Sequence, residues 1–221
     1  MTGGVVELAG PAGAGKTTVA RALVRSLPGA RLGSPPGRLA TVRSVVTAAP
    51  VLLASRSVAA PGRWWSEAEL RSVGYLLAWQ RQPRGAGTGE PLLFDHGPVF
   101  RLAMLVAGRP QALRHPVFGP WWWRTATAWG RLLDTVVVLD APTDELIARI
   151  EARPREHRVR GADPREAERF VDAYRLAFDQ VLRVVSDEGT PVVRVDTAAP
   201  PEVVADAVRA RLLVDTSGDR R

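Results

Sequence analysis

Residues 10–17 read GPAGAGKT and match the pattern G-x-x-x-x-G-K-[ST] once in the chain. The glycines of such a stretch let successive backbone N–H groups turn toward phosphate oxygens at the positive end of the following helix. Lys16 offers a compact cation to β- and γ-phosphates, and the Thr17 hydroxyl offers an oxygen to Mg²⁺. The residues of this predicted triphosphate site are Gly10, Pro11, Ala12, Gly13, Ala14, Gly15, Lys16, Thr17 and Thr18.

The basic residues of the chain single out the same position. Of the 30 basic residues, Lys16 is the only lysine and the other 29 are arginines. A planar guanidinium replaces a lysine ammonium poorly where one compact charge must reach a phosphate. We infer that this position needs lysine, as a site for ATP and Mg²⁺ would require.

A second candidate lies at the end of the apolar run LLF, in the segment LLFDHGP at 92–98. Asp95 either caps the helix that starts near Pro98 or points into a site that needs a carboxylate. In an open α/β sheet, ligands bind beyond the carboxyl ends of the strands. We favour the second interpretation, in which Asp95 faces the predicted phosphate site.

The elements that must position these residues alternate along the chain, which is typical of an α/β fold with a doubly wound parallel sheet. We expect strands at 5–9, 30–32, 91–94, 135–139 and 191–195. We expect helices at 16–27, 38–60 with an interruption at Pro50, 66–82, 98–107, 117–131, 142–152, 164–187 and 201–213. The polar residues 215–221 predict a disordered tail behind a single domain at 1–214.

Composition limits the other possibilities. The 221 residues are 46% hydrophobic and 24% charged, as in an ordinary globular domain, and contain no cysteine for disulfides or metal ligation. No apolar run is long enough to span a membrane, and no leader-like start is present, so we expect a cytoplasmic protein. The net charge of +7 arises from arginines scattered through every segment, without a docking motif, so nucleic acid is not the expected partner.

An arginine-rich segment at 148–170 is interrupted by prolines and a glycine. Arginines that close over transferring phosphate oxygens stabilise the charge of the transition state. The segment therefore predicts a lid at about 153–164, with arginines at positions 149, 153, 155, 158, 160 and 165 in and around it. A GTPase would need an [NT]-K-x-D segment, which a chain with one lysine cannot contain, so a small-molecule kinase is favoured.

The chain is similar to the thymidylate kinase-like branch of the P-loop nucleoside and nucleotide kinases. Four stretches carry the resemblance, at 10–23, 92–108, 133–153 and 192–212. It implies a P-loop NTPase fold, with a five-stranded parallel sheet of order 2-3-1-4-5, helices on both faces and an arginine-rich lid. It also implies transfer of the ATP γ-phosphate to a nucleoside or nucleotide in the presence of Mg²⁺.

The same resemblance assigns roles to single residues. Asp95 matches the acid of an Asp-Arg-Tyr/His motif that lies beside acceptor and metal, so Asp95 and Thr17 are expected near one metal ion. Arg153, Arg158 and Arg160 match lid arginines, and Thr197 lies where adenine is usually held. His96 stands where the family has an arginine for the acceptor phosphate, and the following segment 98–105 is apolar apart from Arg101. Arg71 and Arg101 are candidates for an anionic acceptor, and His96 for a polar contact.

Two alternatives remain open at this stage. The acceptor can be a non-nucleotide alcohol, such as an antibiotic, a sugar or a lipid-linked metabolite, because the acceptor half is apolar and rich in tryptophan. A nucleotide-binding regulatory protein is the second alternative. The three consecutive tryptophans at 121–123 cannot share one helix face. At least one of them must lie on substrate or another surface, and we expect a homodimer through the acceptor-side helices.

Overall fold

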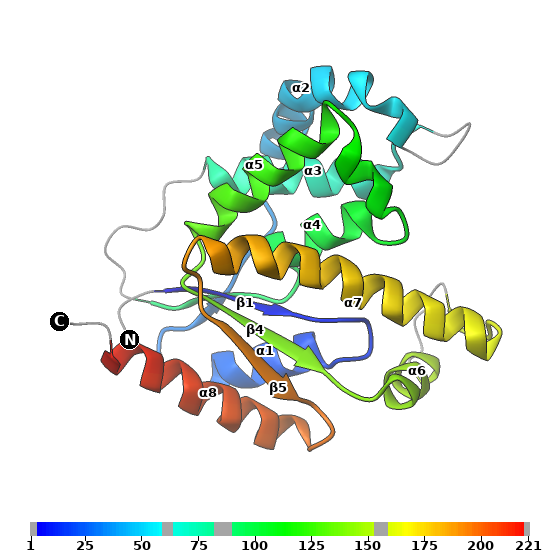
Figure 1. Cartoon of the computed structure of the whole chain (residues 1–221). Helices are drawn as coiled ribbons and strands as arrows, with labels where there is room; N and C mark the ends of the chain where they lie inside the picture. Colours follow the sequence, from blue (N-terminus) through cyan, green and yellow to red (C-terminus); the bar gives the residue numbers. More distant parts are fainter. Residues whose placement is uncertain (1–3, 59–63, 82–89, 153–158, 219–221) are drawn as a thin grey trace.

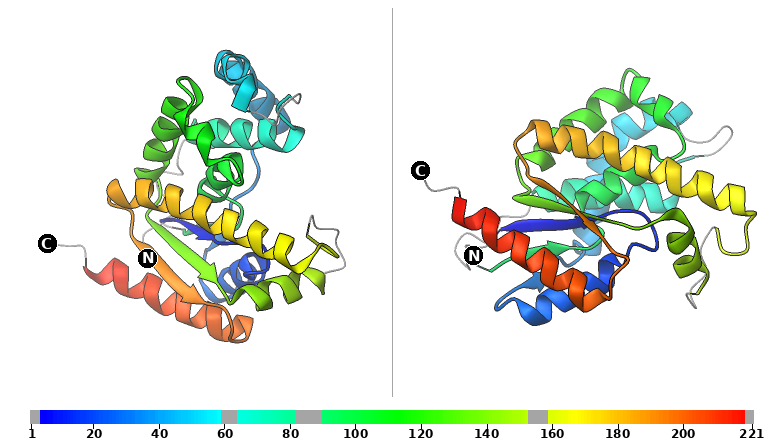
Figure 2. Two further views of the ribbon diagram at one scale, coloured as in Figure 1. Left: turned by 45° about the vertical axis from the view of Figure 1, so that its right-hand side comes forward. Right: turned by 60° about the horizontal axis from the view of Figure 1, so that its bottom comes forward.

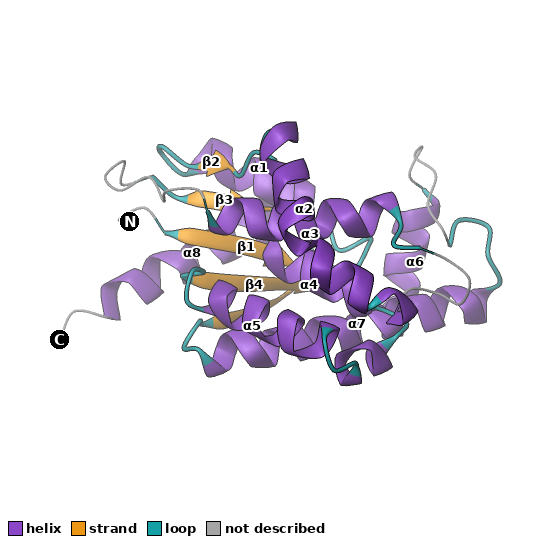
Figure 3. Cartoon of the chain, turned by 90° about the horizontal axis from the view of Figure 1, so that it is seen from above, coloured by secondary structure: helices purple, strands orange, loops and turns teal. Residues whose placement is uncertain are grey.

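The computed structural model describes residues 4–58, 64–81, 90–152 and 159–218, with side chains up to Leu212 in the last helix. Five parallel strands form one sheet of order β2-β3-β1-β4-β5, and Figure 3 shows the first four side by side. The strands are β1 (Val5–Ala9), β2 (Arg31–Leu32), β3 (Leu92–Phe94), β4 (Thr135–Asp140) and β5 (Val192–Asp196). The fold class and the strand order expected from the sequence are confirmed.

Helices cover both faces of this sheet, as Figures 1 and 2 show. Helices α1 and α8 pack together on one face, whereas α4, α5 and α7 lie on the other and α2 packs on α3 farther out. The α-helices are α1 (Lys16–Ser26), α2 (Arg38–Ala54), α3 (Glu67–Gln80), α4 (Pro98–Val106), α5 (Phe118–Gly130), α6 (Thr143–Glu151), α7 (Pro164–Asp187) and α8 (Pro201–Gly218). Short 3₁₀ helices, η1 (Arg56–Val58) and η2 (Pro110–Arg114), follow α2 and α4.

Strand β1 supplies side chains to the cores on both faces because successive residues of a strand point in opposite directions. Val6 and Leu8 belong to the core beneath α1 and α8. Val5 and Ala9 belong to the core beneath α4, α5 and α7. Glu7 therefore points toward α4, on the expected acceptor side of the sheet.

The interruption expected at Pro50 is wrong, because α2 continues through this residue to Ala54. Proline has no N–H and its ring crowds the carbonyl one turn earlier, which weakens a helix locally. Here the turns on either side are held in the core by the buried Ala48 and Leu52. Tertiary packing thus outweighs the local cost of the proline.

The last helix also differs from the expected boundary. We predicted a tail from Asp215, whereas the backbone of α8 is helical to Gly218. Within the described part of the chain, no helix combines the length and the apolar character that a membrane crossing requires.

Candidate active site

The glycine-rich loop between β1 and α1 packs closely against its neighbours. Gly10 has a φ of 135°, and a Cβ atom there would collide with the carbonyl oxygen of Leu139 at the end of β4. At Gly13, a Cβ atom would lie 2.6 Å from the carbonyl oxygen of Leu146 in α6. Side chains are excluded at both positions, so the loop follows a path that only glycine permits.

The first turn of α1 follows this loop and contains no acidic residue that would neutralise the partial positive charge of the helix N-terminus. Gly15 is the N-cap, its position has no side-chain cap, and the first turn contains no acidic residue. Backbone N–H groups at a helix N-terminus carry partial positive charge and bind anions well. Together with the strand before it, the loop has the geometry expected of a phosphate-binding turn. Thr18 is exposed in the same turn.

The Lys16 side chain is enclosed by the loop. Its Nζ atom donates hydrogen bonds of 2.8 Å to the carbonyl oxygens of Gly10 and Pro11. The same atom lies 5.7 Å from the centre of the Phe100 ring, and the residue is buried. The one lysine of the chain is therefore held inside the loop that the sequence assigned to phosphate.

The loop is joined to the end of β3 by a hydrogen bond from the Thr17 hydroxyl to Asp95 Oδ2, at 2.9 Å. The His96 Nδ1 atom lies 3.4 Å from the same oxygen. Hydrogen bonding by His96, and then by Thr17, lowers the pKa of Asp95 to about 2 although partial burial opposes this shift. Asp95 is thus a carboxylate at neutral pH. The helix-cap interpretation is wrong, because Gly97 is the N-cap of α4.

The N-terminus of α4 is instead capped by Glu7, which the sequence analysis did not identify. Its two carboxyl oxygens accept hydrogen bonds from the backbone N–H groups of Val99 and Phe100, at 2.8 and 2.9 Å. Burial raises the pKa of Glu7 to about 8. A Cβ atom at Gly97 would lie 2.8 Å from the Glu7 carboxyl group, so this carboxyl fixes the turn that follows Asp95. The available signal was an acid inside the apolar strand VVELA.

The ends of β4 and β5 are held by two arginines. Arg175 makes a two-point contact with the Asp140 carboxylate, with both N···O distances at 3.0 Å. Arg149 donates to the carbonyl oxygen of Thr197 at 2.8 Å and to its hydroxyl at 3.2 Å. Thr197, expected near adenine, is buried and donates its own hydroxyl hydrogen to Asp140 O. The sequence did not reveal that Arg149 links α6 to this loop.

The expected lid is described only in part. Arg153 and Arg158 lie outside the described residues. Arg160 is exposed in the segment between α6 and α7. Its role and those of Arg153 and Arg158 stay predictions.

On the expected acceptor side, Arg101 reaches from α4 toward α3. Its guanidinium carbon lies 4.2 Å from the centre of the Tyr75 ring and 5.6 Å from that of Trp79. Burial lowers the pKa of Arg101 to about 10. In the described structure, its buried Nε atom has no hydrogen-bond partner. The arginine is thus held by ring faces and leaves hydrogen-bonding capacity for another group.

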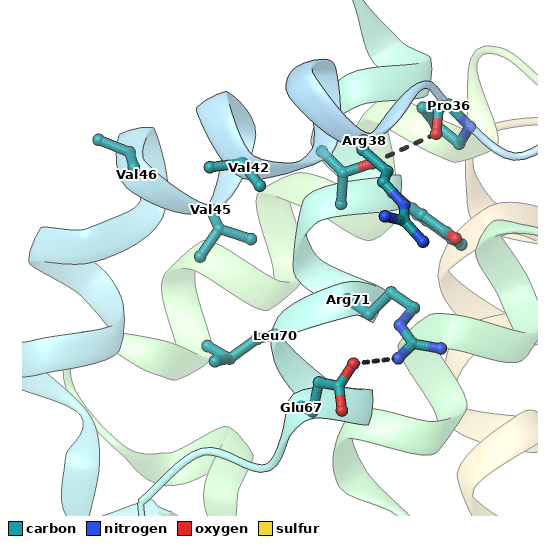
Figure 4. Close-up of a pocket in the computed structure, with 10 residues that line it drawn as sticks. Pro36, Arg38, Val42, Val45, Val46, Glu67, Leu70 and Arg71 are labelled. Carbon is teal, nitrogen blue, oxygen red and sulfur yellow. Dashed lines mark hydrogen bonds and ion pairs between the residues drawn. The ribbon is translucent and has the colours of Figure 1, made fainter.

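A pocket of about 740 Å³ opens between α2 and α3, and we call it the α2–α3 groove (Figure 4). Its lining residues come from the loop before α2, from the start and middle of α2 and from one face of α3. They are Pro36, Arg38, Thr41, Val42, Val45, Val46, Glu67, Leu70, Arg71 and Tyr75. Arg71 thus lies in this groove, where it forms an ion pair with Glu67.

The tryptophans divide between core and surface. Trp122 is fully buried and its neighbour Trp121 nearly so, whereas Trp123 is 44% exposed. Trp64, ahead of α3, is 51% exposed. As consecutive positions on a helix require, one of the three adjacent rings lies outside the core.

Comparison with known proteins identifies the fold. No family model and no curated protein matches the sequence. A solved thymidylate kinase from Candida albicans is similar with a TM-score of 0.63 at 14% identity, over 97% of this chain and 93% of that chain. A deoxyadenosine kinase from M. mycoides with bound dATP gives 0.57 at 15% identity, over 95% and 99%. At such identities the likeness concerns the fold.

Proposed function

We propose that this chain, which has the fold of the P-loop nucleoside and nucleotide kinases, is a kinase. It would transfer the γ-phosphate of ATP to a small molecule in the presence of Mg²⁺. The observation that carries this proposal is the hydrogen bond between Thr17 and Asp95. It brings the loop predicted to bind phosphate together with a carboxylate at the end of the neighbouring strand. This is the arrangement that phosphoryl transfer to a bound hydroxyl requires.

On the donor side, backbone N–H groups of residues 10–18 would bind the triphosphate, and Lys16 would exchange its bonds to loop carbonyls for bonds to phosphate oxygens. Thr17 and Asp95 fit Mg²⁺, because a hydroxyl and a carboxylate oxygen 2.9 Å apart are hard donors of the kind that it prefers. When bound, Mg²⁺ supplies charge that neutralises the phosphate oxygens. Thr197 would border the adenine.

Asp95 would orient the acceptor hydroxyl. A carboxylate with a pKa near 2 is a weak proton acceptor, so its low pKa favours orientation and metal binding over storage of the proton. Phosphoryl transfer passes through a loose transition state in which early removal of the proton contributes little. Arg153, Arg158 and Arg160 would close over the charge that develops on the transferred group.

The leading acceptor is a nucleoside or nucleotide, which is what the structural neighbours are named for. A second acceptor class, a non-nucleotide alcohol, is favoured by the α2–α3 groove, whose walls are largely aliphatic. His96 favours it as well, because this residue is weaker than arginine as a partner for an acceptor phosphate.

The test is an acceptor screen with the purified full chain, Mg²⁺ and ATP, in which ADP release is measured for wild type and Asp95→Asn. The panel contains nucleosides, nucleoside monophosphates, sugars, aminoglycosides and polyprenol-like alcohols. We expect at least one hydroxyl compound to drive ADP release that Asp95→Asn largely removes. ATP that fails to bind the wild-type protein would overturn the proposal.

We also propose a homodimer through the acceptor-side helices. Trp64 and Trp123 leave large ring surfaces exposed on this half of the molecule, and exposed aromatic rings are common at protein interfaces. Sedimentation of wild type and Trp123→Ser is the test. A monomer at all concentrations for wild type would exclude the dimer.

A further inference from the structure

The α2–α3 groove is a candidate for the body of the acceptor, because its inner end adjoins the predicted site. Tyr75 lines the groove, and the Arg101 guanidinium lies over its ring at 4.2 Å. Asp95 lies in the turn between β3 and α4, and Arg101 lies in the first turn of α4. We therefore take the groove as the continuation of the site at Asp95, so that a molecule with its hydroxyl at Asp95 would extend past Arg101 toward the groove. The volume of about 740 Å³ suits a ligand of drug-like size.

One end of the groove is cationic. Figure 4 shows the Arg38 and Arg71 side chains on the same side of the groove, from α2 and α3 respectively. The Arg101 guanidinium carbon lies 4.2 Å from the centre of the ring of Tyr75, which also lines the groove. Glu67 is the one acid that lines the groove within the described structure, and it pairs with Arg71. Two guanidinium groups line the groove beside one carboxylate, and a third lies over the Tyr75 ring, so an anion would be attracted here.

Two further observations favour an anion at this end. Helix α2 begins at Arg38 with Gly37 as its N-cap, and has neither a side-chain cap nor an acid in its first turn. Its N-terminus therefore adds partial positive charge. The buried Nε atom of Arg101 lacks a hydrogen-bond partner within the described residues, and burying such a donor unpaired costs free energy. An anion would supply a partner for it once the guanidinium turned toward the groove.

The other end of the groove is aliphatic. Its wall consists of Val42, Val45 and Val46 from α2 and Leu70 from α3, as Figure 4 shows. Val42 and Val46 are 59% and 65% exposed, so they have apolar surface available to a ligand.

Polar groups that could read the edge of a nucleobase are few among the described lining residues. The Thr41 hydroxyl donates to the carbonyl oxygens of Pro36 and Gly37, and Glu67 is engaged by Arg71. The Tyr75 hydroxyl remains, and no amide side chain is among these residues. A base bound here would leave polar atoms unpaired, which lowers affinity.

We infer that the acceptor is an alcohol that carries an anionic group and a hydrocarbon body. The anionic group binds Arg38, Arg71 and Arg101, and the body lies against Val42, Val45 and Leu70. This inference rests on the proposed kinase function and names the substrate class of the same site.

The first experiment measures dissociation constants of alkyl phosphates for the full chain by calorimetry, with Mg²⁺ and a non-hydrolysable ATP analogue present. The probes are inorganic phosphate, butyl phosphate, hexyl phosphate, uncharged 1-hexanol and thymidine monophosphate. We expect affinity to rise roughly two- to fourfold per methylene from butyl to hexyl phosphate, because each buried methylene adds hydrophobic free energy. Hexyl phosphate should bind at least about tenfold more tightly than 1-hexanol, because of its charge.

Matched variants test the location. Val42→Glu should weaken hexyl phosphate about tenfold, whereas Val203→Glu should not, because Val203 is similarly exposed but lies on α8 across the sheet. Arg71→Gln should weaken it several-fold, whereas Arg43→Gln on the exposed side of α2 should not. Thermal unfolding of each variant establishes that it is folded. Arg71 is half exposed, so its replacement leaves the core intact.

Several results would overturn the inference. Equal affinity for 1-hexanol and hexyl phosphate would exclude the anion site, and equal affinity for inorganic phosphate would exclude the hydrocarbon site. Tighter binding of thymidine monophosphate than of hexyl phosphate would restore a nucleotide acceptor. A dimer that Val42→Glu dissociates would assign the groove to a second copy of the chain. If the wild-type protein binds the ATP analogue but no alkyl phosphate, this inference alone is refuted. If it does not bind the ATP analogue, the proposed function is refuted.

Discussion

The two sides of the proposed active site, on which we expect ATP and the acceptor to bind, are built in different ways; we call them the donor side and the acceptor side. On the donor side, one continuous segment of strand, loop and helix contains the lysine, and the loop itself holds that lysine through two carbonyl oxygens. On the acceptor side, residues from α2, α3 and α4 converge, and Arg101 rests on aromatic rings with an unpaired Nε atom among the described residues. The donor side is therefore formed by one contiguous segment with fixed geometry. The acceptor side depends on side chains from three separate helices.

The two sides meet at the turn after β3. Asp95 is bound to the loop by Thr17, and Glu7 beneath this turn caps α4. A change in the turn should therefore affect both sides, whereas a change in the loop or the groove should affect one.

Substitution of Lys16 should have the largest effect. Both Lys16→Gln and Lys16→Arg should lower ATP-dependent phosphoryl transfer roughly 10²- to 10³-fold, because a positioned charge is lost or replaced by a larger planar group. The initial rate of ADP release checks this. Wild-type activity of Lys16→Arg would contradict the description of the donor side as a fixed, local structure, because any cation could then replace the lysine.

Asp95→Asn should lower the turnover number on the order of 10- to 100-fold, because the amide keeps the size of the side chain but loses its charge. Asp187→Asn, at an exposed position at the end of α7, is the control. A change in the Michaelis constant for ATP alone, with an unchanged turnover number, would place Asp95 on the donor side only.

Glu7 gives a prediction for stability. Its pKa is raised to about 8 in the folded protein, so the stability that its proton confers is fully present below about pH 4.5 and is lost as the pH rises toward 8. The free energy of unfolding of wild type relative to Glu7→Gln should fall by up to about 1.4 kcal/mol per pH unit in this window. Urea unfolding at pH 5, 6.5 and 8 measures it. A difference between the two proteins that is independent of pH would show that Glu7 is ionised throughout.

Arg149→Gln should have the smallest effect, because this arginine acts through Thr197 rather than on the reacting atoms. We expect a rise of about three- to tenfold in the Michaelis constant for ATP, as is typical for the loss of one or two hydrogen bonds, and little change in the turnover number. Arg183→Gln, on the exposed side of α7, is the control. An equal effect of both variants would remove Arg149 from the donor site.

Much of the fold could be predicted because its signals are local. The loop motif, the strand that precedes it and the apolar runs of the other strands are contiguous in sequence, and the resemblance supplied their order. The role of Glu7 could not be predicted, because it depends on α4, which follows more than ninety residues later. The link between Arg149 and Thr197 also joins residues that are far apart in sequence, 48 positions from each other. Continuation of α2 through Pro50 depends on packing that local propensity does not contain.

The tryptophans are confined to one part of the molecule, so their fluorescence reports on that part. All seven lie between residues 64 and 129, and none belongs to the loop, to α1 or to the strands β4 and β5. Trp79 donates its indole N–H to Ser34 O and lies beside Phe94 and beneath Arg101. Tryptophan fluorescence therefore reports on the half of the molecule that contains residues 64–129, whereas tyrosine emission also comes from Tyr174 in α7. A ligand that changes the emission spectrum has reached that half or altered its packing, and no label needs to be attached to observe it.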